Sequence, residues 1–141
     1  MARFAAVGEE ITKELRLSPE EIARFSSLSG DENPLHHDEA HARGTRFGGI
    51  IASGTQTVAI LMGLTATHFS RKGASLGLDF SFRLRKACRA NDALRFRWRV
   101  ERVEWKEKLG GELVFLDGEV RDGAGDLAIT ASALVLVKDR L

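Results

Sequence analysis

The sequence predicts an α+β fold in which a curled antiparallel sheet wraps around one long buried helix. The second half of the chain contains four segments of alternating apolar and polar residues, which is the period of a half-buried strand. The first half contains a stretch without charged side chains, residues 47–70, which is typical of a helix covered on all sides. With 141 residues and 43% apolar content, the chain can bury one core, so we expect a single domain over residues 1–141.

The first elements are a strand and a capped helix. Residues 11–17 alternate weakly and predict a strand. The residues Ser18-Pro19-Glu20-Glu21 combine a capping box with proline at the first helical position, and both features mark the start of a helix. Apolar residues at helical spacing then predict a helix from about Pro19 to Ser29, which leads directly into the segment 30–36.

Two further helices flank a glycine-rich loop. Asp38 is expected to cap a short helix that ends near Arg43. Residues 44–54 form the loop, and the uncharged helix begins near Ser53. Because the uncharged stretch also contains hydroxyl, amide and imidazole groups, it suits a buried helix better than a membrane span.

After Gly73 the chain has the two-residue period of strands. The predicted strands cover residues 76–84, 94–105, 113–120 and 127–137. The alternation slips before Val103, which predicts a β-bulge. Turn-forming pairs separate the strands at Asn91-Asp92, Gly110-Gly111 and Asp122-Gly123. An antiparallel sheet curled around the uncharged helix is the economical packing for these elements.

The segment from Gly30 to His36 carries most of the chemistry in the chain. Asp31 supplies a carboxylate that can hold and activate a water, and His36 supplies an imidazole that exchanges protons near neutral pH. Gly30 permits a tight backbone, while Pro34 biases Asn33 toward extended geometry. The segment therefore predicts a rigid loop that directs two proton-transfer groups at one point.

The loop and the order of elements resemble the MaoC-like (R)-specific enoyl-CoA hydratase and dehydratase family, whose fold is the hot-dog fold. The family signature is an aromatic residue and a short stretch before Gly-Asp-x-Asn-Pro-x-His, matched here by Phe25, Gly30, Asp31, Asn33, Pro34 and His36. A second match, Phe-Gly-Gly-Ile-Ile-Ala-Ser-Gly at residues 47–54, resembles the family's entry to the central helix. The resemblance covers nearly the whole chain.

The resemblance implies reversible syn addition of water to a trans-2-enoyl-CoA, with no cofactor beyond the CoA of the thioester. Asp31 and His36 would hold the water and move its protons, and Asn33 would steady the loop. The Gly54 amide, at a helix N-terminus, would stabilise the negative charge that builds on the thioester oxygen. The other residues expected at the substrate are Pro34, Gly49, Ser53, Arg83 and Lys86. CoA phosphates need local cations, and the candidates for them are Arg83, Arg85 and Lys86.

Two positions depart from the family pattern. Ser53-Gly54 stands where many members have His-Gly, and Ala59 stands where some have a serine. These differences leave the oxyanion site intact, but they leave the length of the acyl chain open.

The residues alone also permit other interpretations. Asp31 and Asn33 suit turn hydrogen bonds, which would make the loop purely structural. The side chains that would form a metal site are Asp31, His36, His37, Asp38 and His41, but they lack a recognised ligand spacing, so we expect no metal. The alternative functions are an acyl-CoA thioesterase of the same fold and a non-catalytic acyl-CoA-binding subunit.

Charge and cysteine content bound the partners and the compartment. The net charge is +1, so we expect neither nucleic acid nor a membrane as a partner, and Arg95, Arg97 and Arg99 fall on the predicted solvent face. The single cysteine, Cys88, fits a reducing cytoplasm, and the N-terminal apolar run is too short for a signal peptide. The resemblance implies at least a homodimer, which would cover the open edge of a short sheet.

Overall fold

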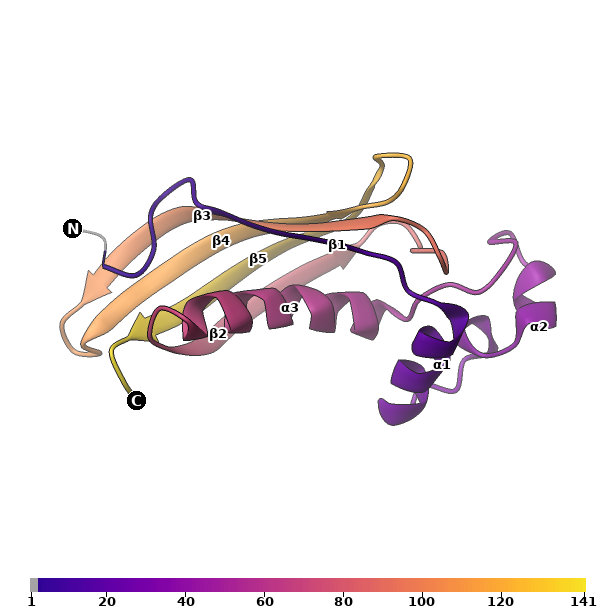
Figure 1. Cartoon of the computed structure of the whole chain (residues 1–141), viewed down its shortest axis with the longest axis horizontal. Coiled ribbons are helices and arrows are strands. Elements are labelled where there is room, and N and C mark those ends of the chain that lie inside the picture. Colours follow the sequence, from indigo (N-terminus) through magenta and orange to yellow (C-terminus); the bar gives the residue numbers. More distant parts are fainter. Residues whose placement is uncertain (1–2) are drawn as a thin grey trace.

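The computed structural model describes residues 3–141 as a curled antiparallel sheet with one long helix along its concave face (Figure 1). The helices are α1 (Pro19–Leu28), the 3-10 turn η1 (Pro34–His36), α2 (Glu39–Arg43) and α3 (Gly54–Ser70). The strands are β1 (Glu10–Leu15), β2 (Ala74–Leu84), β3 (Leu94–Lys106), β4 (Gly111–Arg121) and β5 (Leu127–Lys138). The five strands lie in the order β1-β3-β4-β5-β2, so β1 and β2 are the sheet edges.

The predicted hot-dog arrangement of strands and helices is confirmed, with small differences in the bounds. β1 ends at Leu15 rather than Leu17, because Leu15 pairs with Leu94, the first residue of β3. The capping box at Ser18 and the cap at Asp38 are both formed. The turn η1 was not expected, and it begins where the Asn33 side chain accepts a hydrogen bond from the amide of Leu35.

The alternation of β3 divides core from solvent. Leu94, Phe96, Trp98 and Val100 are fully buried, and the intervening arginines lie on the outer face of the sheet. There Arg97 contacts carboxylates of both neighbouring strands, Glu10 of β1 and Glu119 of β4. The bulge predicted before Val103 is confirmed as a register shift between Val100 and Arg102.

A buried tryptophan connects the sheet to α3. The indole N–H of Trp98 donates a hydrogen bond of 2.8 Å to the carbonyl oxygen of Leu61 in α3. Trp98 pairs with Gly118 of β4, and a Cβ at Gly118 would lie 2.5 Å from the indole ring. Glycine at this position therefore makes room for the indole, which holds the helix against the centre of the sheet.

Two expectations about burial are wrong for the single chain. The helix α3 is not covered on all sides: Leu61 and Phe69 are fully buried, but Met62 is 39% exposed. In β2, Leu76 and Leu78 are also exposed instead of lying in the core. The cause is the place of β2 at the sheet edge, together with a register shift after Gly77 that breaks its alternation.

The length and hydropathy required to span a bilayer are not combined in any helix of residues 3–141.

Candidate active site

The end of α1 determines where the Asp31 backbone lies. Gly30 has a positive φ of 78°, and its amide donates to the carbonyl of Ser27. The amide of Asp31 donates to the carbonyl of Ser26 at 2.8 Å. These two bonds form a Schellman motif, which turns the chain sharply after the helix and favours glycine at the left-handed position. Asp31 is therefore attached to a helix end rather than to a mobile loop.

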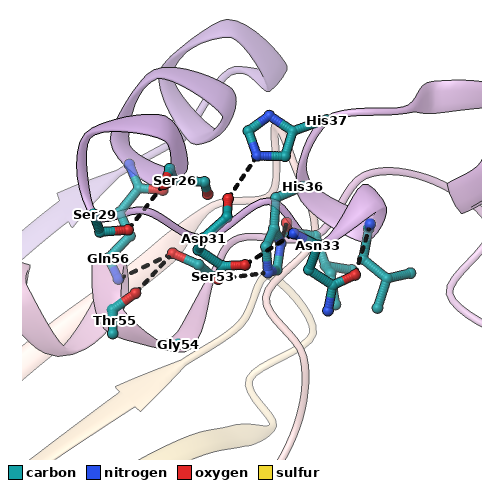
Figure 2. Close-up of polar contacts among 12 residues, drawn as sticks. Ser26, Ser29, Asp31, Asn33, His36, His37, Ser53, Gly54, Thr55 and Gln56 are labelled. Carbon is teal, nitrogen blue, oxygen red and sulfur yellow. Dashed lines mark hydrogen bonds and ion pairs between the residues drawn. The ribbon is translucent and has the colours of Figure 1, made fainter.

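The two carboxylate oxygens of Asp31 have different environments (Figure 2). Oδ1 accepts a hydrogen bond of 3.0 Å from the amide of Asn33, and this Asx turn holds the loop. Oδ2 lies 3.4 Å from Nε2 of His36. The turn hydrogen bonds of the structural interpretation are thus present, and they leave one oxygen available for chemistry.

His36 is buried, and one neighbour settles its tautomer. Nδ1 lies 2.8 Å from the carbonyl oxygen of Ile51. Because a carbonyl oxygen only accepts hydrogen bonds, Nδ1 must carry a proton. In the neutral imidazole Nε2 is then an unprotonated acceptor, and it points toward Asp31 (Figure 2).

The Ile51 carbonyl is held by segments that are distant in sequence. The amide of Ile51 donates to Leu35, in the same turn as His36, at 3.2 Å. The chain on either side of Ile51 pairs with the connection between β2 and β3, through Ala52 to Cys88 at 2.8 Å and Ala90 to Ile50 at 2.9 Å. The orientation of the His36 ring is therefore fixed by backbone rather than by flexible side chains.

The separation of Asp31 and His36 suits a shared water. An ionised carboxylate and the unprotonated Nε2 are both acceptors, so at 3.4 Å they repel unless a donor lies between them or beside them. A water molecule can donate one hydrogen to each, which leaves its oxygen lone pairs free to react. The arrangement can hold a nucleophilic water and remove a proton from it.

The N-terminus of α3 lies beside this pair (Figure 2). Ser53 caps the helix, since its hydroxyl accepts from the amide of Gln56 at 3.3 Å, and Thr55 also donates to it. Within residues 3–141 the amide of Gly54 donates to no acceptor. A Cβ on Gly54 would lie 2.5 Å from the terminal methyl group of Leu84, so a larger residue here would displace that side chain from the cavity wall.

His37 is a second contact to the loop that the sequence did not indicate. Its Nε2 lies 2.8 Å from the backbone carbonyl oxygen of Asp31, to which it must donate a hydrogen bond. The side chain of His37 is exposed to solvent, and this hydrogen bond links it to the backbone at Asp31, at the start of the segment that ends at His36 (Figure 2).

A cavity of about 530 Å³ lies next to His36. Its lining residues include Asn33, His36, Gly54, Thr57 and Leu84. Asp31 is not among the lining residues, and its carboxylate contacts His36 from outside the cavity.

The expected substrate-binding residues are only partly at this cavity. Lys86 lines it, whereas Pro34, Gly49, Ser53 and Arg83 do not. The ammonium of Lys86 lies 2.6 Å from Asp122 and 2.8 Å from Asp126, and these hydrogen bonds raise the pKa of Lys86 above its ordinary value. The positive charge of Lys86 is thus already balanced by two carboxylates that are distant from it in the sequence.

Cys88 lines the cavity as well, and its thiol is buried. Burial raises the pKa of the Cys88 thiol to about 11, and the nearby charges of Asp122 and Asp92 add to this effect, so the thiolate is disfavoured. Within residues 3–141, no three His, Cys, Asp or Glu side chains are grouped as a metal ion would require.

Fold and site together define a class: a hot-dog protein with a carboxylate and an imidazole at the N-terminus of its central helix. The family model described as the MaoC like domain matches residues 4–114. The chain belongs to this MaoC-like family.

Individual relatives agree with this assignment. The chain is 36% identical over 84 residues to the (R)-specific enoyl-CoA hydratase of Aeromonas caviae, covering 59% of this chain and 63% of the relative. It is 25% identical over 137 residues to a UPF0336 protein of Thermobifida fusca (strain YX), covering 92% and 88%. The solved structure of the (R)-hydratase from A. caviae superimposes with a TM-score of 0.86 at 26% identity, covering 96% of this chain and 99% of that one.

Proposed function

We propose that the protein is an (R)-specific enoyl-CoA hydratase, which also dehydrates (R)-3-hydroxyacyl-CoA in the reverse direction. The observation that carries the proposal is the pair of acceptors, Asp31 Oδ2 and His36 Nε2, separated by 3.4 Å at the N-terminus of α3. The similarity to the A. caviae protein named (R)-specific enoyl-CoA hydratase supports the substrate class and the stereochemistry.

In the hydration direction, the water held by Asp31 and His36 attacks the β-carbon of the enoyl thioester. One O–H bond of the water breaks, and its proton passes to one of the two acceptors. The electron pair of the double bond moves toward the thioester oxygen, and the α-carbon then receives a proton from the Asp31–His36 pair. The net change is one hydroxyl on the β-carbon and one hydrogen on the α-carbon, so neither residue is altered.

Negative charge builds on the thioester oxygen during the attack, and the N-terminus of α3 can stabilise it. The Gly54 amide has no acceptor within residues 3–141, and it lies at the positive end of a helix of 17 residues. A donor that is already oriented toward the developing charge lowers the barrier without reorganising first.

The experiment compares the wild type with Asp31→Asn on crotonyl-CoA and on a longer enoyl-CoA, following the loss of enoyl-thioester absorbance. Asparagine retains an oxygen that can accept from the Asn33 amide, so the loop is kept while the negative charge is removed. We expect the wild type to form the (R)-3-hydroxyacyl product and the variant to lose about 10²–10⁴-fold in kcat/KM. Full activity in the variant would remove Asp31 from the proposed role.

The same samples test the alternative chemistry. Release of free thiol, measured in parallel, would identify a thioesterase, since hydration leaves the thioester intact. Binding of CoA thioesters without either product would identify a non-catalytic subunit, and in that case Asp31→Asn would leave the affinity unchanged.

We also propose that the chain forms a homodimer through β2. Leu76 and Leu78 are exposed on this edge strand, and Met62 is exposed on the adjacent side of α3. A second copy paired along β2 would cover these apolar side chains and the free strand edge. Sedimentation of the wild type at the mass of two chains would support this pairing, and Leu78→Lys should shift it toward one chain.

A further inference from the structure

Two exposed arginines line the cavity, and no carboxylate of residues 3–141 forms an ion pair with either of them. Arg46, in the loop before α3, and Arg85, directly after β2, both line the cavity that reaches His36 and Gly54. Both side chains are exposed, and within residues 3–141 neither guanidinium has an ion pair or a hydrogen bond to another side chain.

Lys86, the third cationic residue that lines the cavity, differs from the two arginines because it forms ion pairs. Lys86 is adjacent to Arg85 in sequence, but its ammonium is held between Asp122 and Asp126. No acidic side chain of residues 3–141 lines the cavity, so nothing in its wall balances Arg46 and Arg85. The unpaired positive charge in the cavity wall therefore comes from the two arginines rather than from the lysine.

Both arginines are attached to well-fixed parts of the fold. The guanidinium of Arg46 lies 4.9 Å from the centroid of the Phe47 ring, a cation–π contact that limits its positions. The amide of Arg85 donates to the carbonyl of Ala128 at 2.8 Å, which fixes its backbone beside β5. Such arginines can bind an anion at a smaller entropic cost than freely moving side chains.

We infer that Arg46 and Arg85 form an anion-binding subsite for a negatively charged group of the substrate, which rests on the proposed function. Guanidinium groups bind phosphates and carboxylates through paired, charge-assisted hydrogen bonds. A CoA thioester carries phosphates at its nucleotide end, and a dicarboxylic acyl group carries a carboxylate at the other end. These are the two sources of the anion, and they can be separated by the choice of substrate.

The test uses three thioesters with the full-length protein. Crotonyl-CoA carries phosphates only, crotonyl-pantetheine carries no anion, and glutaconyl-pantetheine carries a carboxylate only. The variants are Arg46→Gln and Arg85→Gln. Arg71→Gln, which changes the same charge at the opposite end of α3, is the matched control.

We expect each variant of the pair to lower kcat/KM for crotonyl-CoA by about five- to tenfold, because a charge-assisted hydrogen bond is lost at a partly screened site. The values for crotonyl-pantetheine should not change, and Arg71→Gln should behave as the wild type with all three substrates. A loss confined to glutaconyl-pantetheine would assign the subsite to a substrate carboxylate instead. Equal losses on all three thioesters, or no loss on any, would overturn the inference.

A binding measurement separates this inference from the proposed reaction. Calorimetric titration with CoA and with pantetheine requires no turnover. If the wild type prefers CoA and the two variants lose that preference, the subsite stands even for a protein that hydrates none of the thioesters. If the wild type hydrates crotonyl-pantetheine and crotonyl-CoA with equal kcat/KM, and prefers neither CoA nor pantetheine, the reaction stands and the subsite does not.

Discussion

The two ends of α3 treat their polar groups in opposite ways. At the N-terminal end the Gly54 amide has no acceptor within residues 3–141, and Asp31 Oδ2 faces His36 Nε2 across 3.4 Å without a hydrogen bond. At the C-terminal end the carboxylate of Glu9 contacts His68, and it accepts hydrogen bonds from Lys72 at 2.6 Å and from the amide of Ala6 at 3.1 Å.

A second carboxylate near the C-terminal end of α3 follows the same rule as Glu9. Glu112, at the start of β4, is almost fully buried and accepts from the amides of Arg3, Phe4 and Ala5 at 2.8, 2.8 and 3.1 Å. The comparison teaches that the paired polar groups near the C-terminal end of α3 hold the first residues of the chain against the core. The unpaired groups at the N-terminal end of α3 are instead available to a substrate. Substitutions near the C-terminal end of α3 should therefore affect stability, and substitutions at its N-terminal end should affect activity.

The largest effect is expected from His36→Asn. The asparagine amide can still donate to the Ile51 carbonyl as Nδ1 does, but it has no atom at the position of Nε2. We expect kcat for crotonyl-CoA to fall by about 10²–10⁴-fold while the thermal midpoint changes little. A pH–rate profile that kept its shape, with kcat near that of the wild type, would contradict a proton-transfer role for His36.

A smaller effect, on stability, is expected from Glu112→Ala. The change leaves three backbone N–H groups of the N-terminal segment without their acceptor, which should lower the free energy of unfolding by about 2–3 kcal/mol. Urea unfolding measures this loss. The free energy of unfolding of Glu112→Gln, which retains one acceptor oxygen, should lie between those of the wild type and Glu112→Ala. If Glu112→Ala instead reduced kcat/KM without reducing stability, the proposed division between the two ends of α3 would be wrong.

The smallest effect is the acid sensitivity conferred by Glu9. Burial alone would raise the pKa of Glu9, but the contacts with Lys72, His68 and the Ala6 amide outweigh it, so the pKa lies below its ordinary value of 4.5. A carboxyl group with a lowered pKa stabilises the fold above that ordinary value, and the contribution is lost as the pH falls through the lowered pKa.

The difference in the free energy of unfolding between the wild type and Glu9→Gln should therefore be about 1 kcal/mol or less near neutral pH. It should shrink as the pH is lowered below 4.5. Urea unfolding at several pH values tests the trend, and a difference that grew in acid would reverse the sign assigned to Glu9.

Much of the fold was predictable because the relevant signals are local. The capping box at Ser18, the alternation of β3 and the bulge after Val100 each depend on a few consecutive residues. The exposure of Leu78 was not predictable in this way, since it depends on the position of β2 at the sheet edge and on a register shift against β5.

The candidate site was predictable to a similar extent. The proximity of Asp31 and His36 follows from a short loop with a glycine and a proline. The neutralisation of Lys86 does not, because its partners Asp122 and Asp126 lie in a hairpin that only the folded sheet brings near.

Two other site contributors were missed for different reasons. The role of Ile51 is performed by its carbonyl oxygen, so its side chain gives no signal. Arg46 was overlooked although it directly precedes the segment that resembles the family's helix entry. That position was the one sequence signal that could have identified it.

The contact between Trp98 and Leu61 has a spectroscopic consequence. The chain has two tryptophans, and only Trp98 is completely buried, with its indole N–H bonded to α3, while Trp105 is 37% exposed. The short-wavelength part of the fluorescence emission therefore comes from Trp98, and it reports whether α3 is seated on the sheet. Trp105→Phe would leave a protein whose single emission follows the docking of the helix, and with it the integrity of the site at the helix N-terminus.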